Sequence, residues 1–319
     1  MRALAVTGNG STQSLVLTEL PIPRPAAGEI TIDVDAAGIG LIDAFWATGF
    51  MPHRDGLVPG LEVAGTVREA GAGVADFVPG QRIAAILPDA GGFAEVARAS
   101  AALCAPIPDD MTSEQAAIVP VNTVTAHLAL TTVARFSKGE SVLVHAAMGG
   151  LGSQFGQIAR RLGAQRVDAV VGSAAKRDMA RHLGYDNTYL RNNLSGIPQA
   201  TYDIVVDSVG GEATATAFRA LRAGGRLIRV GNASQAPDVQ LSSLAHWFEN
   251  KTTAGFNVGG WLRAYPGQGT ESLLWALDAV AAGDIRVPLT GTAPLDECNT
   301  LLEPLLRGDT TGKLALNVR

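Results

Sequence analysis

Cysteine is scarce in this chain of 319 residues, which contains two, Cys104 and Cys298, far apart in the sequence. Two isolated cysteines exclude a disulfide framework, and they cannot form the paired Cys-x-x-Cys knuckles of a structural zinc site. Cysteine behaves as a small apolar residue when it has no such partner. We therefore expect both to be ordinary core or surface residues.

Long apolar runs and runs of one charge are also missing. No stretch approaches the ~20 apolar residues of a membrane helix, and Met1–Val6 reads as a strand rather than as the start of a signal peptide. The net charge is −5 and no basic stripe occurs, which argues against a nucleic-acid partner. We expect a cytoplasmic protein that binds neither membranes nor nucleic acids.

The composition that remains is that of a folded globular protein. Hydrophobic residues make up 47% of the chain and charged residues 17%, which excludes general disorder. A chain of this length buries a large core and is typical of about two domains.

The first part of the chain is predicted to be rich in β-structure. Short strand-like runs alternate with turn residues such as Pro59-Gly60 and Pro79-Gly80, a pattern typical of a barrel-like domain. The expected strands are Leu4–Thr7, Glu29–Val34, Glu62–Arg68, Gln81–Leu87 and Phe93–Ala97.

The pattern changes near Met111. Thr112 to Gln115 can cap a helix, and strands then alternate with helices, which predicts parallel pairing and a doubly wound sheet. From about Trp261 we expect two helical stretches and a final strand, Lys313–Val318. The expected strands in between are Ser141–Ala147, Val167–Val171, Ile204–Val209 and Arg226–Val230, and the helices Ser153–Leu162, Ala174–Leu183 and Ala213–Leu221.

The sharpest local signal is a glycine-rich turn between an apolar strand and a helix. The strict Gly-x-Gly-x-x-Gly pattern fails, but Ala146, Gly149 and Gly152 have the spacing Ala-x-x-Gly-x-x-Gly. Such a turn brings backbone N–H groups and a helix N-terminus close to a dinucleotide pyrophosphate. A plain tight turn is the alternative. The candidate pyrophosphate-binding residues are Met148, Gly149, Gly150, Leu151 and Gly152.

The end of the second strand of this region favours NADPH over NADH. An NAD site usually carries an acidic residue there, whereas this strand ends in Val171, Gly172 and Ser173, with Lys176 and Arg191 following. A hydroxyl and cations attract a 2′-phosphate that a carboxylate would repel. The alternative is that Lys176 and Arg191 are solvated surface charges. Asp168 lies within the strand and is not assigned to the ribose.

With these features, the chain resembles the medium-chain dehydrogenase/reductase superfamily, and within it the zinc-independent quinone oxidoreductases. The order and spacing of the matching motifs carry the resemblance over almost the whole length. The motifs are Ala37-Gly38-Ile39 with Asp43, Pro59 to Gly65, Gly80 to Ile83, Gly91 to Glu95, Thr125-Ala126, Lys176, Leu183-Gly184, Asp207 to Gly211, Gly224 to Arg226 and Gly312-Lys313.

The resemblance implies an α/β fold in which a doubly wound Rossmann domain is inserted into a β-rich, GroES-like catalytic domain. The implied catalytic domain comprises residues 1–122 and 262–319, and the NADPH-binding domain residues 123–261. The active site is then expected between them. Dimers are common in this family, so a homodimer is one expected arrangement.

Two departures from the zinc alcohol dehydrogenases of the superfamily predict a site without metal. Those enzymes place Cys where this chain has Gly40, and His where it has Leu61. Catalytic zinc needs three protein ligands, and Glu62 alone does not make a site. Quinone oxidoreductases often have Asn at the first of these positions and Tyr where this chain has Phe45.

The expected substrate pocket is unusually apolar. Its candidate residues lack a tyrosine that could donate a proton, and they suit a flat hydrophobic substrate; the alternative is that they pack the domain core. His53 is a weaker candidate proton donor than solvent. The candidate catalytic residues are Gly40, Phe45, Trp46, Phe50, Met51 and Thr125.

The resemblance also implies further contacts with the cofactor. Thr125 is expected near the nicotinamide, and Lys313 near a phosphate or the cleft, with an ordinary surface lysine as the alternative. The other implied residues are Val209 and Gly210 on the adenosine side, Ser208 directly before them, and Gly231, Asn232, Phe256, Asn257 and Val258 at the nicotinamide pocket.

The function expected from these observations is NADPH-dependent reduction of a small hydrophobic conjugated carbonyl compound, a quinone or an enone. Conjugation spreads the charge that develops on hydride addition, so no Lewis acid is needed, and the nicotinamide carries the hydride. A 2-enoyl thioester reductase is the first alternative, supported by Gly255-Phe256 with Trp261. A non-catalytic NADPH-binding sensor or crystallin-like protein is the second.

Overall fold

The computed structural model describes residues 1–8 and 14–319 and divides the chain into two compact units. Met1–Val124 and Val258–Arg319 form the first, which we call the N–C unit, and Thr125–Asn257 form the second, the Rossmann unit. The sequence predicted divisions after residues 122 and 261. Among the described residues, no helix has both the length and the apolar character needed to cross a membrane.

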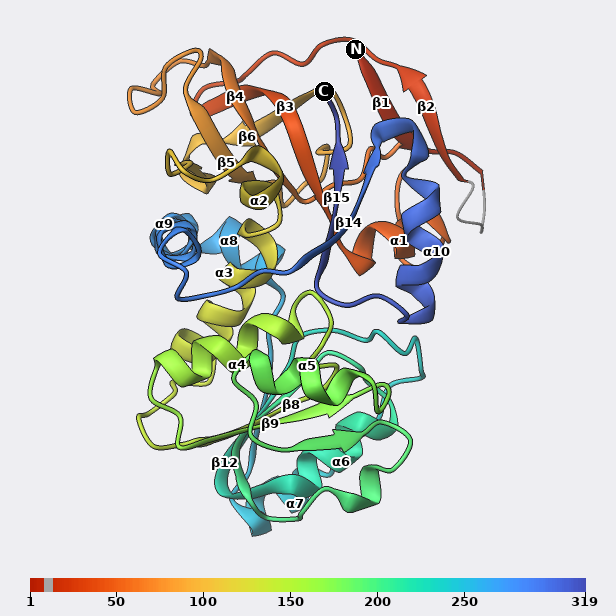
Figure 1. Ribbon diagram of the computed structural model, residues 1–319, viewed down its shortest axis with the longest axis vertical. Coiled ribbons are helices and arrows are strands. Elements are labelled where there is room, and N and C mark those ends of the chain that lie inside the picture. The colour runs from red at the N-terminus through yellow and green to blue at the C-terminus, as the bar shows by residue number, and fades with distance from the viewer. Residues whose placement is uncertain (9–13) are drawn as a thin grey trace. The chain divides into compact units, whose positions relative to one another are not determined.

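A mixed seven-stranded sheet forms the centre of the N–C unit. Its strands follow the order β14-β15-β3-β4-β5-β7, and β6 also pairs with β3. Figure 1 shows the blue C-terminal strands beside the orange N-terminal ones. The strands of the unit are β1 (Arg2–Val6), β2 (Leu15–Glu19), β3 (Glu29–Ile39), β4 (Glu62–Ala70), β5 (Arg82–Ile86), β6 (Val96–Ser100), β7 (Cys104–Pro106), β14 (Leu289–Pro294) and β15 (Lys313–Asn317).

The helices of this part of the chain differ most from expectation. Thr112 caps α2 as predicted, since its Oγ1 accepts a hydrogen bond from Gln115 N at 3.3 Å. However, α2 ends within two turns. Pro120 then starts a new helix, where its missing N–H group costs nothing because the first N–H groups of a helix have no partner within it. From the sequence we predict neither the helix Leu41–Ala47 nor a separate helix Val258–Ala264. The helices are α1 (Leu41–Ala47), α2 (Ser113–Ala117), α3 (Pro120–Leu128), α8 (Val258–Ala264), α9 (Pro266–Ala281) and α10 (Asn299–Arg307).

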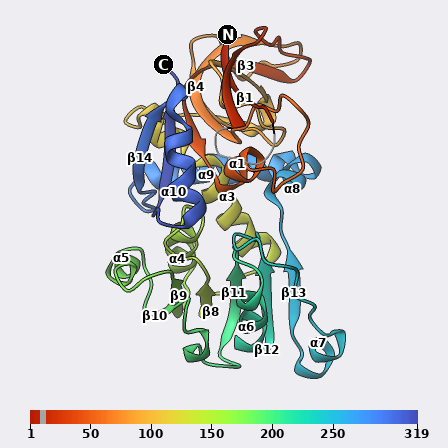
Figure 2. The same ribbon diagram turned by 90° about the vertical axis from the view of Figure 1, so that its right-hand side faces the viewer.

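The Rossmann unit contains a six-stranded sheet in which every strand pairs in parallel with its neighbours, in the order β10-β9-β8-β11-β12-β13, as Figure 2 shows. Its apolar strand interiors pack against the helices, so the sheet lies within the core. The strands are β8 (Ser141–Val144), β9 (Arg166–Val171), β10 (Thr188–Leu190), β11 (Tyr202–Asp207), β12 (Leu221–Arg229) and β13 (Thr252–Gly255).

The strand order reverses between β8 and β11. The connection through α4 leads from β8 to β9 on one side, and the connection through α6 leads from β11 to β12 on the other. Because such crossovers are right-handed, the helices of the two halves cover opposite faces. The doubly wound fold predicted from the sequence is confirmed. The helices are α4 (Gly152–Arg161), α5 (Lys176–His182), α6 (Glu212–Ala220) and α7 (Ser243–Glu249).

The reversal of strand order decides where a ligand is expected. In open α/β sheets, ligands bind beyond the carboxyl ends of the strands at the point where the order reverses. The loops at this edge contain residues 145–151, 172–175, 208–211 and 230–233, because they follow β8, β9, β11 and β12.

Candidate active site

The glycine-rich turn between β8 and α4 is a tightly packed structure. Ala146 adopts a left-handed conformation with φ of 51°, and its carbonyl accepts a hydrogen bond from Gly149 N at 2.9 Å. A Cβ atom on Gly152 would lie 2.2 Å from Ala146 O and 2.7 Å from Ala147 Cα. The start of α4 therefore passes so close to the end of the strand that only glycine fits.

The outer part of the same turn has space for a ligand. A Cβ atom on Gly149 would meet a single neighbouring atom, Ala146 O, at 3.4 Å. Leu151 precedes α4 and provides no side-chain cap, and no acidic residue occupies the first helical turn. A helix end with these properties attracts an anion. The residues of this turn fit a dinucleotide pyrophosphate, with Met148, which is buried, contributing its backbone.

Arg191 lies beside the residues that follow β9. Its backbone N donates to Val171 O at 2.9 Å, and its guanidinium Cζ would be 3.8 Å from a Cβ atom on Gly172. Ser173 is exposed, and its carbonyl accepts from Lys176 N at 3.2 Å at the start of α5. The end of β9 thus combines a hydroxyl with a nearby cation, which suits a phosphate group.

Asp168 is fully buried in the middle of β9. Its carboxylate accepts from Arg166 Nε at 2.8 Å, from Tyr202 Oη at 2.6 Å and from Asn187 Nδ2 at 2.9 Å. An aspartate with these internal partners cannot serve as the ribose ligand at the strand end.

The loops that follow β11 and β12 are joined by backbone hydrogen bonds. Ala233 N donates to Ser208 O, and Ser234 N donates to Val209 O, both at 2.9 Å. Gly210 has φ of +87°, and a Cβ atom there would lie 1.9 Å from Asn232 Oδ1. Because of these contacts, the segments that contain Ser208, Val209, Gly231 and Asn232 form one connected rim of the sheet.

The remaining candidates near the cofactor follow β13 or lie in α3. Phe256 is buried and its backbone N donates to Arg229 O at 2.9 Å, while Asn257 is exposed. Val258 is the first residue of α8. Thr125 is buried in α3, with 6% of its surface exposed.

In the N–C unit, the candidate catalytic residues surround α1. Phe45 is buried and contacts Phe50 edge to face, with 4.8 Å between the ring centroids, and Trp46 packs against the hydrophobic core. Phe50 and Met51 are 40% and 36% exposed. Phe45 and Trp46 therefore pack against the core of the domain, which is the alternative stated in the sequence analysis. Phe50 and Met51 present an apolar surface.

Gly40 is positioned by an aspartate that the sequence analysis names as a motif residue but not as a site residue. Asp43 is 1% exposed, and its two carboxylate oxygens accept from Gly40 N and Gly60 N, each at 2.8 Å. Burial raises the pKa of this carboxyl to about 6, although both backbone hydrogen bonds act to lower it. Asp43 thereby ties the start of α1 to the Pro59-Gly60 turn.

The position of Lys313 corrects the expectation that it contacts the cofactor. The side chain is 2% exposed, and its ammonium group binds the Glu62 carboxylate and donates to Ile39 O at 3.0 Å. The other Glu62 oxygen accepts from Val121 N at 2.7 Å, near the start of α3. An ammonium group held in this way is an internal counter-ion and cannot bind a phosphate.

Two further expectations concern metal and proton donors. Within residues 1–8 and 14–319, no three His, Cys, Asp or Glu side chains gather closely enough to hold a metal ion; action without zinc stays a prediction. His53 is half-buried, and its Nδ1 is 3.0 Å from Arg54 O.

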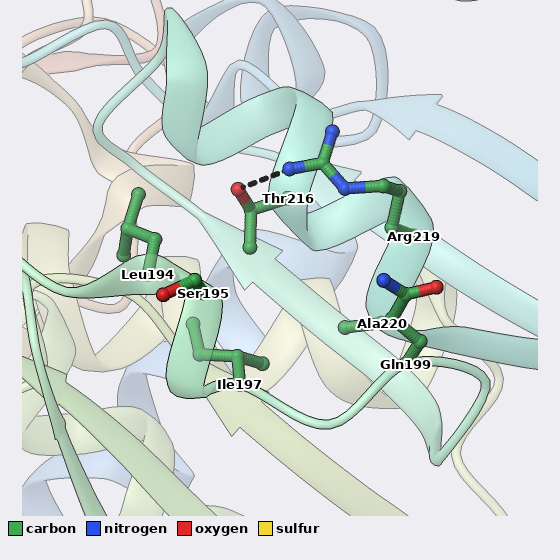
Figure 3. A pocket seen from close by; sticks show the side chains of 7 residues that line it. All are labelled: Leu194, Ser195, Ile197, Gln199, Thr216, Arg219 and Ala220. Carbon is green, nitrogen blue, oxygen red and sulfur yellow. Dashed lines mark hydrogen bonds between the residues drawn. The ribbon is translucent and has the colours of Figure 1, made fainter.

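A small cavity of about 150 Å³ lies elsewhere in the Rossmann unit. It is formed by the segments that precede β11 and β12, so it lies at the amino ends of these strands, opposite the glycine-rich turn. Figure 3 shows Arg219 donating to Thr216 at its wall, at 3.0 Å. Ligands of open α/β sheets bind at the other edge, so we assign this cavity no role in cofactor binding.

Comparisons with known proteins agree with this geometry. Residues 26–109 match the alcohol dehydrogenase GroES-like domain, and residues 150–273 match the zinc-binding dehydrogenase family. The chain belongs to the medium-chain dehydrogenase/reductase superfamily, a superfamily of oxidoreductases, as the resemblance predicted. The β-rich GroES-like domain and the Rossmann domain are confirmed with it.

Two solved structures resemble the whole chain. One is a mycobacterial protein in complex with NADPH, with 28% sequence identity and a TM-score of 0.89. The other is the Escherichia coli quinone oxidoreductase in complex with NADPH, with 25% identity and a TM-score of 0.88. In both comparisons the match covers 100% of this chain and of the other.

A third relative is a much larger protein. The spectinabilin polyketide synthase system protein NorB of Streptomyces orinoci is 32% identical over 326 aligned positions, which include 99% of this chain. The chain spans about a seventh of that relative's length, since the match covers 14% of it.

Proposed function

We propose that the chain is an NADPH-dependent reductase that delivers hydride to a conjugated carbonyl compound. The observation that carries the proposal is the arrangement at the carboxyl edge of the parallel sheet. There, a glycine-rich turn at an uncapped helix start lies next to a strand end that has a nearby arginine and no acid. This combination suits NADPH, a dinucleotide that carries a 2′-phosphate in addition to its pyrophosphate.

Except for Val258, the residues that would hold the cofactor lie on loops and helices of the Rossmann unit. Residues 148–152 would hold the pyrophosphate, and Ser173, Lys176 and Arg191 with the backbone of Gly172 the 2′-phosphate. Ser208 and Val209 would lie on the adenosine side of the cofactor, and Thr125, Gly231, Asn232, Phe256, Asn257 and Val258 at its nicotinamide end. The NADPH bound by the two structural relatives supports this choice of cofactor.

The bound cofactor supplies a hydride ion, and the reaction needs one further proton. In an enone, the hydride forms a new C–H bond at the β-carbon, the carbon–carbon double bond is lost, and the α-carbon takes a proton from solvent. NADPH is oxidised to NADP⁺ as the enone becomes a saturated carbonyl compound. A quinone gains the same hydride and proton and becomes a hydroquinone.

The proposed substrate-binding surface is an apolar part of the N–C unit. Phe50 and Met51 are exposed beside Phe45, and Gly40 leaves room near the start of α1. We propose that a flat hydrophobic substrate binds against these residues and that residues 1–122 and 262–319 form the catalytic domain. Conjugation in the substrate spreads the developing negative charge onto oxygen until solvent supplies the proton.

A 2-enoyl thioester is a second candidate substrate. The similarity to a polyketide synthase protein over 99% of the chain favours it. The chemistry is the same, since the thioester carbonyl is conjugated with the double bond that receives the hydride.

A substrate panel tests the proposal. NADPH oxidation is followed by absorbance with a benzoquinone, a 2-alkenal, a crotonyl thioester and a saturated ketone. We expect at least one of the three conjugated substrates to react more than about tenfold faster than the ketone, a difference of about 1.4 kcal/mol in activation free energy. Faster reduction of the ketone, or NADPH binding without any turnover, contradicts the proposal; the latter result is that of a sensor.

A further inference from the structure

We infer that Asp207, Thr214 and Arg229 form a clamp that positions the loops after β11 and β12 for NADPH; Asp207 and Thr214 are buried and Arg229 is half-buried. The inference rests on the proposed function, because it concerns the same cofactor site. None of the three side chains is proposed to touch the cofactor. They are positioning residues, which act through the backbone that follows each strand.

Asp207 is the centre of the clamp. It is the last residue of β11, it is fully buried, and its Oδ1 accepts from Val209 N at 2.8 Å and from Gly210 N at 3.1 Å. Its other oxygen, Oδ2, accepts from Thr214 Oγ1 at 2.6 Å. One carboxylate therefore holds the loop after β11 and the first turns of α6 together.

Arg229 connects this carboxylate with the next strand. It is the last residue of β12, lies directly opposite Asp207 in the parallel register, and has its Nε 3.3 Å from Asp207 Oδ2. It also donates from Nη1 to Thr214 Oγ1 at 2.6 Å and from Nη2 to Gly231 O at 3.3 Å. The guanidinium group thus reaches the loop after β12, which contains two candidate cofactor residues.

The charge of Asp207 is balanced within the clamp. His145 is its neighbour on the other side in the sheet, because Val206 pairs with Val144. Burial lowers the pKa of His145, although the nearby Asp207 acts to raise it. The positive charge that compensates the buried carboxylate comes from Arg229, and removing either partner leaves a buried charge uncompensated.

The opposite end of the same two strands provides a matched control. Asp203 in β11 accepts from Arg222 Nε of β12 at 2.6 Å and from Ser141 Oγ at 2.7 Å. This pair also joins an aspartate of β11 to an arginine of β12, but it lies at the amino ends of the strands, and Arg222 is 53% exposed where Arg229 is 22% exposed. If both pairs are purely structural, NADPH affinity follows the loss of stability in each variant, whereas the clamp predicts a loss of cofactor affinity at one end alone.

The experiment compares D207N, T214V and T214S with D203N in the full chain. For each protein, the NADPH dissociation constant is measured by fluorescence titration, and the free energy of unfolding by urea denaturation. We expect D207N and T214V to bind NADPH roughly tenfold more weakly, which is the effect of losing one hydrogen bond to a charged group. The NADPH dissociation constant of D203N is expected to stay within about twofold of that of the parent chain. T214S restores the hydroxyl and is expected to regain most of the affinity lost in T214V.

The outcomes separate this inference from the proposed function. If the parent chain binds no NADPH, the proposed function fails. If the parent chain binds NADPH and D207N and T214V bind it as tightly as D203N does, the clamp is wrong while the proposed function stands. If D207N does not fold, the comparison of T214V with T214S tests the clamp instead, because valine keeps the shape of threonine and serine keeps its hydroxyl group.

Discussion

Replacing Gly152 by alanine tests the packing of the glycine-rich turn. The added methyl carbon would lie 2.2 Å from Ala146 O and 2.7 Å from Ala147 Cα. Both are backbone atoms, so a rotamer change cannot relieve the contact. The first turn of α4 must move away from the end of β8, and the N–H groups at the helix start must move with it.

The size of the effect follows from the geometry. Overpacking of a tight interior site costs about 1–3 kcal/mol, and we expect G152A to lose this amount of unfolding free energy. G149A is the matched control, because its methyl carbon would meet Ala146 O alone, at 3.4 Å. We expect G149A to keep the stability of the parent chain to within about 0.5 kcal/mol, yet to bind NADPH more weakly because its methyl group fills the space proposed for the pyrophosphate.

Two measurements on the parent chain and three variants complete this test. Urea denaturation gives the unfolding free energy, and titration with NADPH gives the dissociation constant. A third variant, G156A, controls for damage to α4 itself, since its methyl carbon would lie 2.6 Å from the ring of Tyr185 rather than from the turn. The reasoning is refuted if G152A matches the parent chain in stability, or if G149A binds NADPH as tightly as the parent chain does.

Three further predictions concern single side chains. R191Q is expected to weaken NADPH binding by roughly ten- to hundredfold and NADH binding by less than about twofold, measured by titration with R181Q as the exposed control; equal losses for both cofactors would remove Arg191 from the 2′-phosphate site. K313M is expected to lower the unfolding free energy by about 3–5 kcal/mol, because it leaves Glu62 buried and uncompensated, and E62Q/K313M to regain at least half of that loss. The raised pKa of Asp43, about 6 against the ordinary 3.8, means that the folded protein holds this proton more tightly than the unfolded chain does. The stabilisation that comes from this more tightly held proton is therefore complete below pH 3.8 and is lost as the pH rises to about 6. We expect the difference in unfolding free energy between the parent chain and D43N to change over this interval and to stay constant above it.

The parts of the fold that could be predicted from the sequence are those determined by local periodicity. Apolar strands alternate with amphipathic helices from Ser141 onward, and the glycine spacing marks the turn before α4, so the doubly wound sheet follows from short windows of sequence. The short helix α1 could not be predicted in this way. It depends on Asp43, whose carboxylate is shared with Gly60 N, 17 positions later in the chain.

The parts of the candidate site that are formed by the backbone of short segments could be predicted from the sequence. Contacts between side chains that lie far apart in the sequence could not. The sequence shows Lys313 as one more lysine, and nothing near it indicates that Glu62, 251 positions away, neutralises it in the core. Asp207 and Arg229 similarly become a pair only through the register of β11 and β12. A signal was available for Asp207 alone, because an aspartate directly before the Ser208 to Gly211 turn can accept from the turn's N–H groups.

The place of β15 in its sheet has a consequence for the biogenesis of the protein. This strand lies between β14 and β3 and pairs Leu314 with Ile39 and Asn317 with Ala36. During translation, β3 leaves the ribosome long before its neighbour exists, whereas the Rossmann unit is one uninterrupted segment, Thr125–Asn257. The inserted unit can therefore complete its own hydrogen bonding while the chain is still being made. The sheet of the N–C unit must wait, with residues 36–39 of β3 unpaired along one edge, until β15 has been translated.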